Sequence, residues 1–134
     1  MPRTSGFNHI ATLTPDLDRF QAWYSQVFEA VTTFEMAAEG DHPRMAILDI
    51  GCGGFLNVFE VPLNSIIGDR RSIGARGAID HFGLAVSDLA ELEQTRDRLR
   101  EAGADTNEIQ KLGTEWSLFF RDVDGMELEV CAPT

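Results

Sequence analysis

The sequence predicts an α+β fold made of two β-α-β-β-β modules in tandem, and three observations support this prediction. The first is an internal repeat, because the pair Asn8-His9 and the apolar run after it return in the second half of the chain as Asp80-His81 and a similar run. The second is that each copy continues through an Asp-Leu pair into a stretch with helical spacing of apolar residues. The third is that three short apolar runs, separated by turn residues, follow each helical stretch.

Composition limits the possible function classes. The chain has 134 residues, about one domain, and its 43% hydrophobic and 25% charged residues are typical of a soluble globular domain. The net charge of −11 argues against nucleic acid or an anionic membrane surface as the main partner. Two cysteines do not form a disulfide framework, and neither a signal peptide nor a membrane-spanning run is visible. We therefore expect a cytoplasmic protein.

In the first module, a strand is expected over residues 7–13, and a helix follows it. Thr14 is a suitable N-cap for this helix, and Pro15 is a suitable first helical residue. One helical face then carries Leu17, Phe20, Trp23, Tyr24, Val27 and Phe28, which we expect to be core residues. The strands expected next cover residues 31–36, 44–50 and 54–61.

The second module repeats this order. A strand is expected over residues 79–86, and Asp88 and Glu91 have the spacing of a helix-capping pair. The helix has a narrower apolar stripe than the first one, and Gly103 is its expected stop. Further strands are expected over residues 105–109, 116–121 and 126–131. The chain is then a single domain, with module one over about 6–62, a linker over about 63–78 and module two over about 79–132.

Each module ends on a strand that carries a carboxylate among apolar residues. His9 opens the first module and Glu60 closes it, while His81 opens the second module and Glu129 closes it. A carboxylate in such surroundings is costly unless it has a partner. A divalent cation is a suitable partner, because it binds both imidazole and carboxylate groups. The two pairs are therefore a candidate metal site.

The sequence resembles the vicinal oxygen chelate superfamily, which includes glyoxalase I, extradiol dioxygenases and bleomycin resistance proteins. The resemblance covers nearly the whole chain, and it is carried by the two strand starts Asn8-His9 and Asp80-His81, by Asn57-Val58-Phe59-Glu60, and by the closing segment Asp122-Val123-Asp124-Gly125-Met126-Glu127-Leu128-Glu129. Val123 stands where the family often has Pro, which changes the rigidity of the turn and not the ligand set.

The resemblance implies a glyoxalase-like fold, in which the two modules pair into a curved mixed sheet around a cleft. It implies one divalent metal ion (Ni, Co, Zn, Mn or Fe), held by His9, Glu60, His81 and Glu129. It also implies a small-molecule substrate and a homodimer.

The activity that the resemblance implies is that of a lyase or isomerase. The substrate would chelate the metal through two adjacent oxygens, and Glu60 or Glu129 would move a proton at carbon. One alternative is an extradiol-type dioxygenase, although a fourth protein ligand would occupy a position that dioxygen needs. Another alternative is a protein of the bleomycin-resistance type, which sequesters a small molecule without converting it.

Further side chains have two interpretations each. Arg70, Arg71 and Arg76 make the linker locally basic, and we interpret them as solvated loop residues, with binding of a substrate carboxylate or phosphate as the alternative. Glu127 shares a strand face with the closing carboxylate, and it is either a solvated residue or an auxiliary acid or base. Cys131 is interpreted as a small buried residue rather than a nucleophile.

Overall fold

The computed structural model describes residues 1–69 and 72–134, and it divides into two compact units, Met1–Ile66 and Ile67–Thr134. The division falls inside the predicted linker. Each unit is a β-α-β-β-β module with its own four-stranded sheet, so the predicted α+β fold with tandem modules is confirmed. Arg70 and Arg71 lie outside the described residues, and the interpretation of these two arginines stays a prediction.

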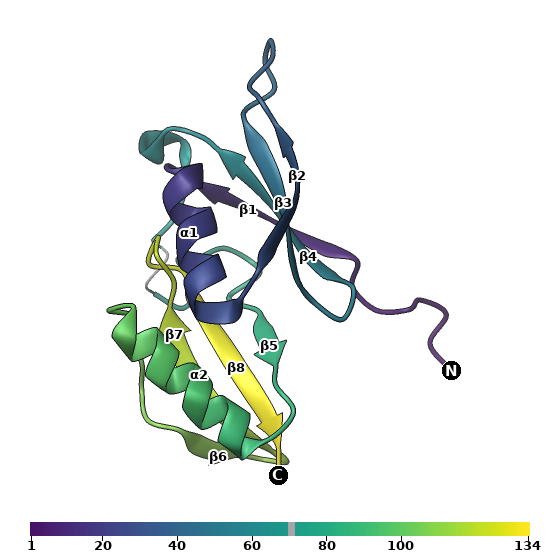
Figure 1. Ribbon diagram of the computed structural model, residues 1–134, viewed down its shortest axis with the longest axis vertical. Helices are drawn as coiled ribbons and strands as arrows, with labels where there is room; N and C mark the ends of the chain where they lie inside the picture. Colours follow the sequence, from purple (N-terminus) through teal and green to yellow (C-terminus); the bar gives the residue numbers. More distant parts are fainter. Residues whose placement is uncertain (70–71) are drawn as a thin grey trace. The chain divides into compact units, whose positions relative to one another are not determined.

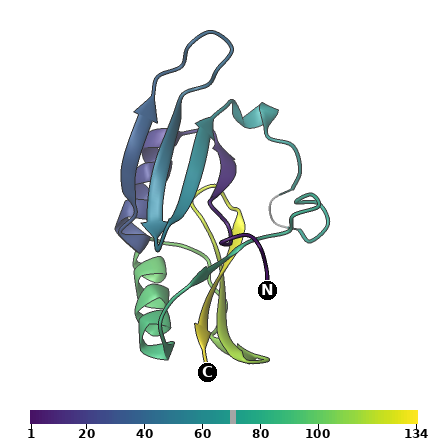
Figure 2. The same ribbon diagram turned by 90° about the vertical axis from the view of Figure 1, so that its right-hand side faces the viewer.

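Unit 1 is a mixed sheet with one helix (Figures 1 and 2). Its elements are β1 (His9–Thr14), α1 (Leu17–Phe28), β2 (Val31–Met36), β3 (Met45–Gly51), β4 (Gly54–Glu60) and the short 3-10 helix η1 (Leu63–Ser65). The strand order is β1-β4-β3-β2, with β1 parallel to β4 and the other pairs antiparallel.

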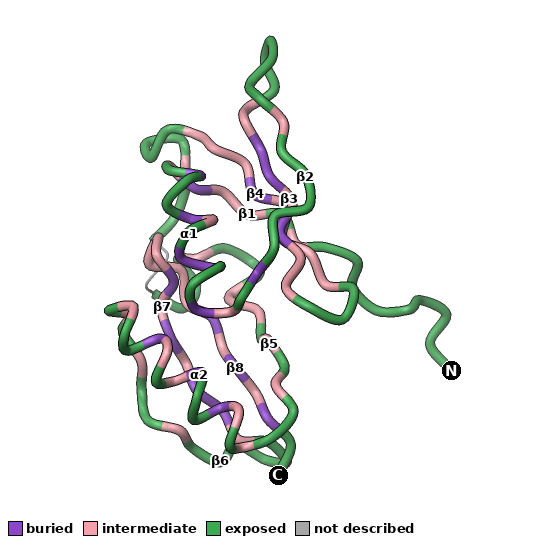
Figure 3. Tube along the Cα trace, viewed as in Figure 1, coloured by how far each residue is buried: buried purple, intermediate pink, exposed green. Residues whose placement is uncertain are grey.

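The core of unit 1 lies between α1 and one face of this sheet (Figure 3). The expected apolar stripe of α1 is buried from Leu17 to Val27, whereas Phe28, also expected in the core, is only half-buried. On the sheet, every second residue in the middle of β4 is buried, as at Leu56 and Val58, while Asn57 between them is only half-buried. Successive side chains of a strand point to opposite faces, so the other face of the sheet carries Asn57.

Asp16, and not Thr14, is the N-cap of α1. The Arg19 backbone N–H donates to Asp16 Oδ1 at 3.0 Å. The prediction of Thr14 is wrong because Thr14 is still part of β1, where it pairs with Glu60 on β4. Its hydroxyl instead accepts the Asp16 N–H at 3.2 Å, and this hydrogen bond helps to hold the capping residue in place.

Unit 2 repeats the topology. Its elements are β5 (Gly83–Ala85), α2 (Leu89–Glu101), β6 (Gln110–Leu112), β7 (Glu115–Arg121) and β8 (Glu127–Pro133), with strand order β5-β8-β7-β6 and β5 parallel to β8. Asp88 caps α2 as predicted, because its Oδ1 accepts the Glu91 N–H at 2.9 Å. Gly103 follows the helix with a φ of +78°, which is the conformation expected of a glycine stop.

The strand predicted over residues 105–109 is wrong, since the edge strand β6 covers Gln110–Leu112 instead. Residues 105–107 run beside β7, where Thr106 and Phe120 form an isolated bridge. The Asn107 side chain accepts the Phe119 N–H at 2.9 Å, so a side chain takes the place of a ladder carbonyl. No helix within residues 1–69 and 72–134 is long and apolar enough to cross a membrane.

Candidate metal centre

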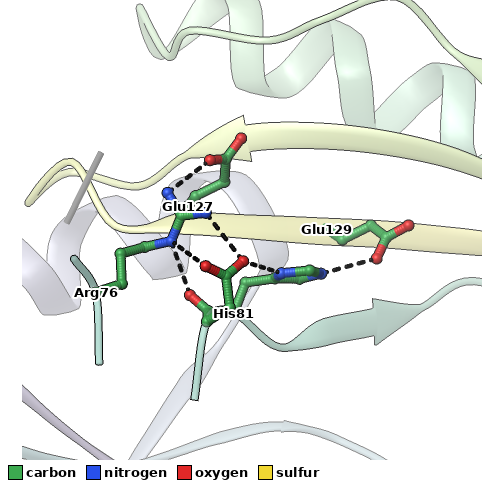
Figure 4. Close-up of polar contacts among 5 residues, drawn as sticks. Arg76, His81, Glu127 and Glu129 are labelled. Carbon is green, nitrogen blue, oxygen red and sulfur yellow. Dashed lines mark hydrogen bonds and ion pairs between the residues drawn. The ribbon is translucent and has the colours of Figure 1, made fainter. Parts of the chain in front are cut away.

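His81 and Glu129 meet in unit 2 (Figure 4). His81 Nε2 lies 3.2 Å from Glu129 Oε2. The pairing of β5 with β8 explains this contact, because Gly83 is opposite Glu129 and the Glu129 N–H donates to the Phe82 carbonyl at 3.2 Å. His81 stands just before this ladder, so its ring reaches across to β8. The structure thus brings together His81 and Glu129 out of the ligand set predicted from the sequence.

The opposite side of the His81 ring is held by a carboxylate. His81 Nδ1 lies 2.9 Å from Asp80 Oδ2, and Asp80 is in turn bound by Arg76 Nη2 at 2.9 Å and by Arg76 Nε at 3.1 Å. The guanidinium also binds Glu127 Oε2 at 2.9 Å (Figure 4). The Arg76 side chain is only 2% exposed, so the interpretation of Arg76 as a solvated loop residue is wrong. Glu127 is likewise ion-paired rather than simply solvated.

Hydrogen bonds also hold the Glu129 carboxylate on the side away from His81. The Ser117 hydroxyl donates to Glu129 Oε1, and Cys131 on the same strand face contacts the carboxylate. Burial raises the pKa of Glu129, but the hydrogen bonds from Ser117, Cys131 and His81 together lower it below its ordinary value. Glu129 is therefore ionised at neutral pH, as a metal-ligating carboxylate must be.

Charges also shift the pKa of the neighbouring groups. The hydrogen bond to Asp80 raises the pKa of His81, with burial opposing it and Glu129 adding to it. The hydrogen bond from Arg76, and to a smaller extent the one from His81, lowers the pKa of Asp80.

Burial raises the pKa of the Cys131 thiol to about 12. This agrees with the interpretation that Cys131 is no nucleophile, since the thiolate is the nucleophilic form, although the residue is half-buried rather than buried as predicted.

The pair His81–Glu129 fits a divalent ion. Two donor atoms that each lie about 2.1 Å from one ion at a right angle are about 3 Å apart, close to the 3.2 Å between Nε2 and Oε2. Imidazole nitrogen and carboxylate oxygen are donors that Zn, Mn, Ni, Co and Fe all accept. Among the described residues, no three His, Cys, Asp or Glu side chains gather into one such group, so unit 2 supplies this pair of donors by itself.

Unit 1 does not bring its two predicted ligands together. His9 is exposed at the start of β1, opposite Phe55, and its Nδ1 lies 2.9 Å from Asn8 Oδ1. Glu60 is at the far end of the same ladder, opposite Thr14. Its Oε2 accepts the N–H of Leu17, the first residue of α1, at 2.7 Å. The ligand role predicted for Glu60 finds no support in this placement.

The register of the two ladders corrects the equivalence that the sequence suggested. In unit 1, Ala11 is opposite Asn57, and in unit 2, Gly83 is opposite Glu129. Ala11 follows His9 at the same distance as Gly83 follows His81, so these two residues are equivalent positions of the repeat. Asn57, not Glu60, therefore holds in unit 1 the position that Glu129 holds in unit 2.

Sequence reasoning missed Asn57, although a signal was present. The triplets Leu56-Asn57-Val58 and Leu128-Glu129-Val130 are related by the same offset as the two histidines. Glu60 has the strand parity of Leu56 and Val58, so it belongs to the face that packs against α1.

A cavity of about 480 Å³ adjoins His81 within unit 2. His81, Arg76, Thr106, Asn107, Phe119 and Arg121 are among the residues that line it. The Phe119 ring stands edge-on to the His81 imidazole, with 5.5 Å between the ring centroids. Phe120 also lines the cavity, although its side chain is almost fully buried.

Comparison with solved structures found the same fold. A glyoxylase/bleomycin resistance protein/dioxygenase domain from Frankia sp. EAN1pec is 26% identical, with a TM-score of 0.83, and the match covers 98% of this chain and 99% of that one. The fosfomycin resistance protein FosX from Listeria monocytogenes is 20% identical, with a TM-score of 0.74 over 98% and 95% of the chains. Lactoylglutathione lyase from Agrobacterium tumefaciens is 21% identical, with a TM-score of 0.70 over 98% and 96%.

No curated protein matched the sequence. The sequence model of one family matches residues 6–130, which is nearly the whole chain. This match agrees with the tandem modules and with the resemblance carried by the two strand starts and the closing segment. The chain belongs to the Glyoxalase/Bleomycin resistance protein/Dioxygenase superfamily, the vicinal oxygen chelate proteins.

Proposed function

We propose that this protein is a divalent-metal-dependent enzyme that moves a proton on a small molecule bound through two adjacent oxygens, as glyoxalases do. The observation that carries the proposal is the His81–Glu129 pair, in which Nε2 and Oε2 lie 3.2 Å apart. Each of these side chains is held from its far side, His81 by Asp80 and Glu129 by Ser117. Such outer hydrogen bonds are typical of metal ligands.

The proposed ligands are His81 and Glu129 of unit 2. In unit 1, His9 is exposed at the start of β1 and is the counterpart of His81 in the repeat, so it stays a candidate ligand. Glu60 is left out of this set, because its carboxylate is engaged by Leu17 and Arg44. One solved structure supplies a precedent for the metal, since a mutant of FosX from Listeria monocytogenes holds Mn(II) with 1S,2S-dihydroxypropylphosphonic acid.

A bound divalent ion would polarise a substrate carbonyl and make the neighbouring C–H more acidic. Glu129 would take that proton and return it on Oε2, which would have to leave the ion for this step, because Oε1 is held by Ser117. The cavity beside His81 would hold the body of the substrate, with Phe119 as its aromatic wall. Phe119 would also keep water away from the His81 ring.

A second candidate is oxygen chemistry at Fe(II). Two histidines and one carboxylate on one face of an ion are the ligand set of many non-haem iron oxygenases. The engagement of Glu60 with Leu17 favours this candidate, because it removes the fourth protein ligand that would block dioxygen. The identity of the metal separates the two candidates.

Elemental analysis of untagged protein tests the proposal. We expect about one divalent ion per chain, with the ion lost in His81→Ala and retained in Glu60→Ala. Ni, Co, Zn or Mn would support proton transfer, which is then assayed as exchange of the substrate C–H proton in deuterated water. Iron would support the oxygenase. No metal after incubation with divalent ions and dialysis would refute both candidates and favour a sequestering protein.

A further inference from the structure

We infer that Asp80 and Arg76 are positioning residues for His81, and that together they hold the neutral ring in the tautomer with its lone pair on Nε2, which is the tautomer that binds a metal through Nε2. The expected effect on metal affinity rests on the proposed function, whereas the tautomer of His81 is measured in metal-free protein and does not depend on it. It also assigns Arg76 a role other than the binding of a substrate carboxylate or phosphate.

The hydrogen bonds of Arg76 support this role. Nη2 and Nε bind the two carboxylate oxygens of Asp80 at 2.9 and 3.1 Å, and Nε also donates to the Asp80 carbonyl at 2.9 Å. Nη1 binds Glu127 at 2.9 Å. Each nitrogen of the guanidinium therefore has an acidic partner, and the side chain is 2% exposed. A planar guanidinium in such contacts fixes the orientation of a carboxylate.

Asp80 transmits this fixed orientation to the imidazole. Asp80 and Glu129 are both carboxylates that only accept hydrogen bonds when ionised, so they compete for the single proton of the neutral His81 ring. The contact with Asp80 is the shorter one, 2.9 Å against 3.2 Å, and this places the proton on Nδ1. The lone pair is then on Nε2, on the side of Glu129. An imidazole without this partner is free to exchange between its two tautomers, and removal of such a partner typically weakens metal binding about 10–100-fold.

The experiment compares Asp80→Ala, Asp80→Asn and Arg76→Gln with the wild-type full chain. The tautomer of His81 is read from its ring nitrogen shifts by NMR in metal-free protein, at a pH where the ring is neutral. Zn²⁺ affinity is read by competition with a chromogenic chelator. We expect the Nδ1–H tautomer in wild type and its loss in Asp80→Ala, with Zn²⁺ binding about 10–100-fold weaker. Asp80→Asn keeps an acceptor oxygen, so it should recover most of both readouts.

Glu127→Gln is the matched control, because it removes the other ion pair of Arg76 and leaves the contact between Asp80 and His81 in place. Its tautomer should match that of wild type. If Arg76→Gln fails to fold, the comparison of Asp80→Ala with Glu127→Gln still tests the inference. A wild-type ring with its proton on Nε2, or an Asp80→Ala ring that stays in the Nδ1–H form, overturns the inference. Wild-type protein that binds no Zn²⁺ refutes the proposed function alone, since the tautomer comparison is made without metal.

Discussion

Replacement of Glu60 by alanine should destabilise the metal-free protein by about 2 kcal/mol. The main loss is the 2.7 Å hydrogen bond from the Leu17 N–H to the carboxylate, which joins residues 43 positions apart in the sequence. Bonds to ionised groups contribute about 1.5–3 kcal/mol when buried, and the 31% exposure of Glu60 places this one at the lower end of that range. A negative charge at the positive end of α1 adds about 0.5 kcal/mol.

The other contact of Glu60 contributes little. Arg44 Nη1 lies 3.5 Å from Glu60 Oε2, and both side chains are about one-third exposed, so this ion pair is worth well under about 0.5 kcal/mol. Glu60→Gln keeps an acceptor oxygen for Leu17 but loses the charge. Its destabilisation should therefore be about half that of Glu60→Ala, or about 1 kcal/mol.

The assay is thermal and urea unfolding in the presence of a chelator. For a chain of this length, about 2 kcal/mol corresponds to a decrease in Tm of about 7 °C. Glu35→Ala is the matched control, because Glu35 also accepts a hydrogen bond, at 2.8 Å from Gln21, but on the exposed surface. A loss below about 0.5 kcal/mol for Glu60→Ala would refute the capping role, and a loss of metal binding in that same variant would restore Glu60 as a ligand.

Three further predictions concern the pKa values and thiols of the chain. Ser117→Ala should raise the pKa of Glu129 towards its ordinary value, cost about 1 kcal/mol in urea unfolding and move acid unfolding to higher pH; an unchanged acid midpoint would contradict this. His81 in metal-free protein should titrate above 6.5 by NMR; its stabilising charge is present at lower pH and lost as the pH rises through that midpoint, so a midpoint at or below 6.5 would be inconsistent with the contacts seen. Iodoacetamide at neutral pH should label the exposed Cys52 well before Cys131, whose thiol has a pKa of about 12; equal rates by mass spectrometry would count against this.

The fold was predictable because the sequence states it twice. The repeated Asn/Asp-His pair, the Asp-Leu pair and the helical stripe are local patterns, and each module needs the same pattern to bury one face of its sheet. The element that failed is the edge strand after α2. There, the Asn107 side chain accepts a hydrogen bond from β7. The segment predicted as a strand therefore ends just before β6, which begins at Gln110.

The candidate site was only partly predictable. His81 and Glu129 stood out because histidine and a strand carboxylate recur at fixed places, and the structure brings them together. Glu60 was predicted as a second such carboxylate, and its apolar neighbours give no sign that it caps a helix beginning 43 residues earlier. Arg76 was interpreted as solvated for a similar reason, because its partner Glu127 is 51 residues away and no local pattern indicates that ion pair.

The two modules differ in charge at one repeated position, because unit 1 holds the neutral amide of Asn57 where unit 2 holds the carboxylate of Glu129. In the centre proposed for unit 2, one imidazole and one carboxylate around a divalent ion would leave one positive charge without compensation. In a chain with a net charge of −11, that charge would attract a negatively charged chelating molecule, while the acidic surface would repel other anions. The proposed centre would therefore favour a substrate that chelates the ion over one that only carries negative charge.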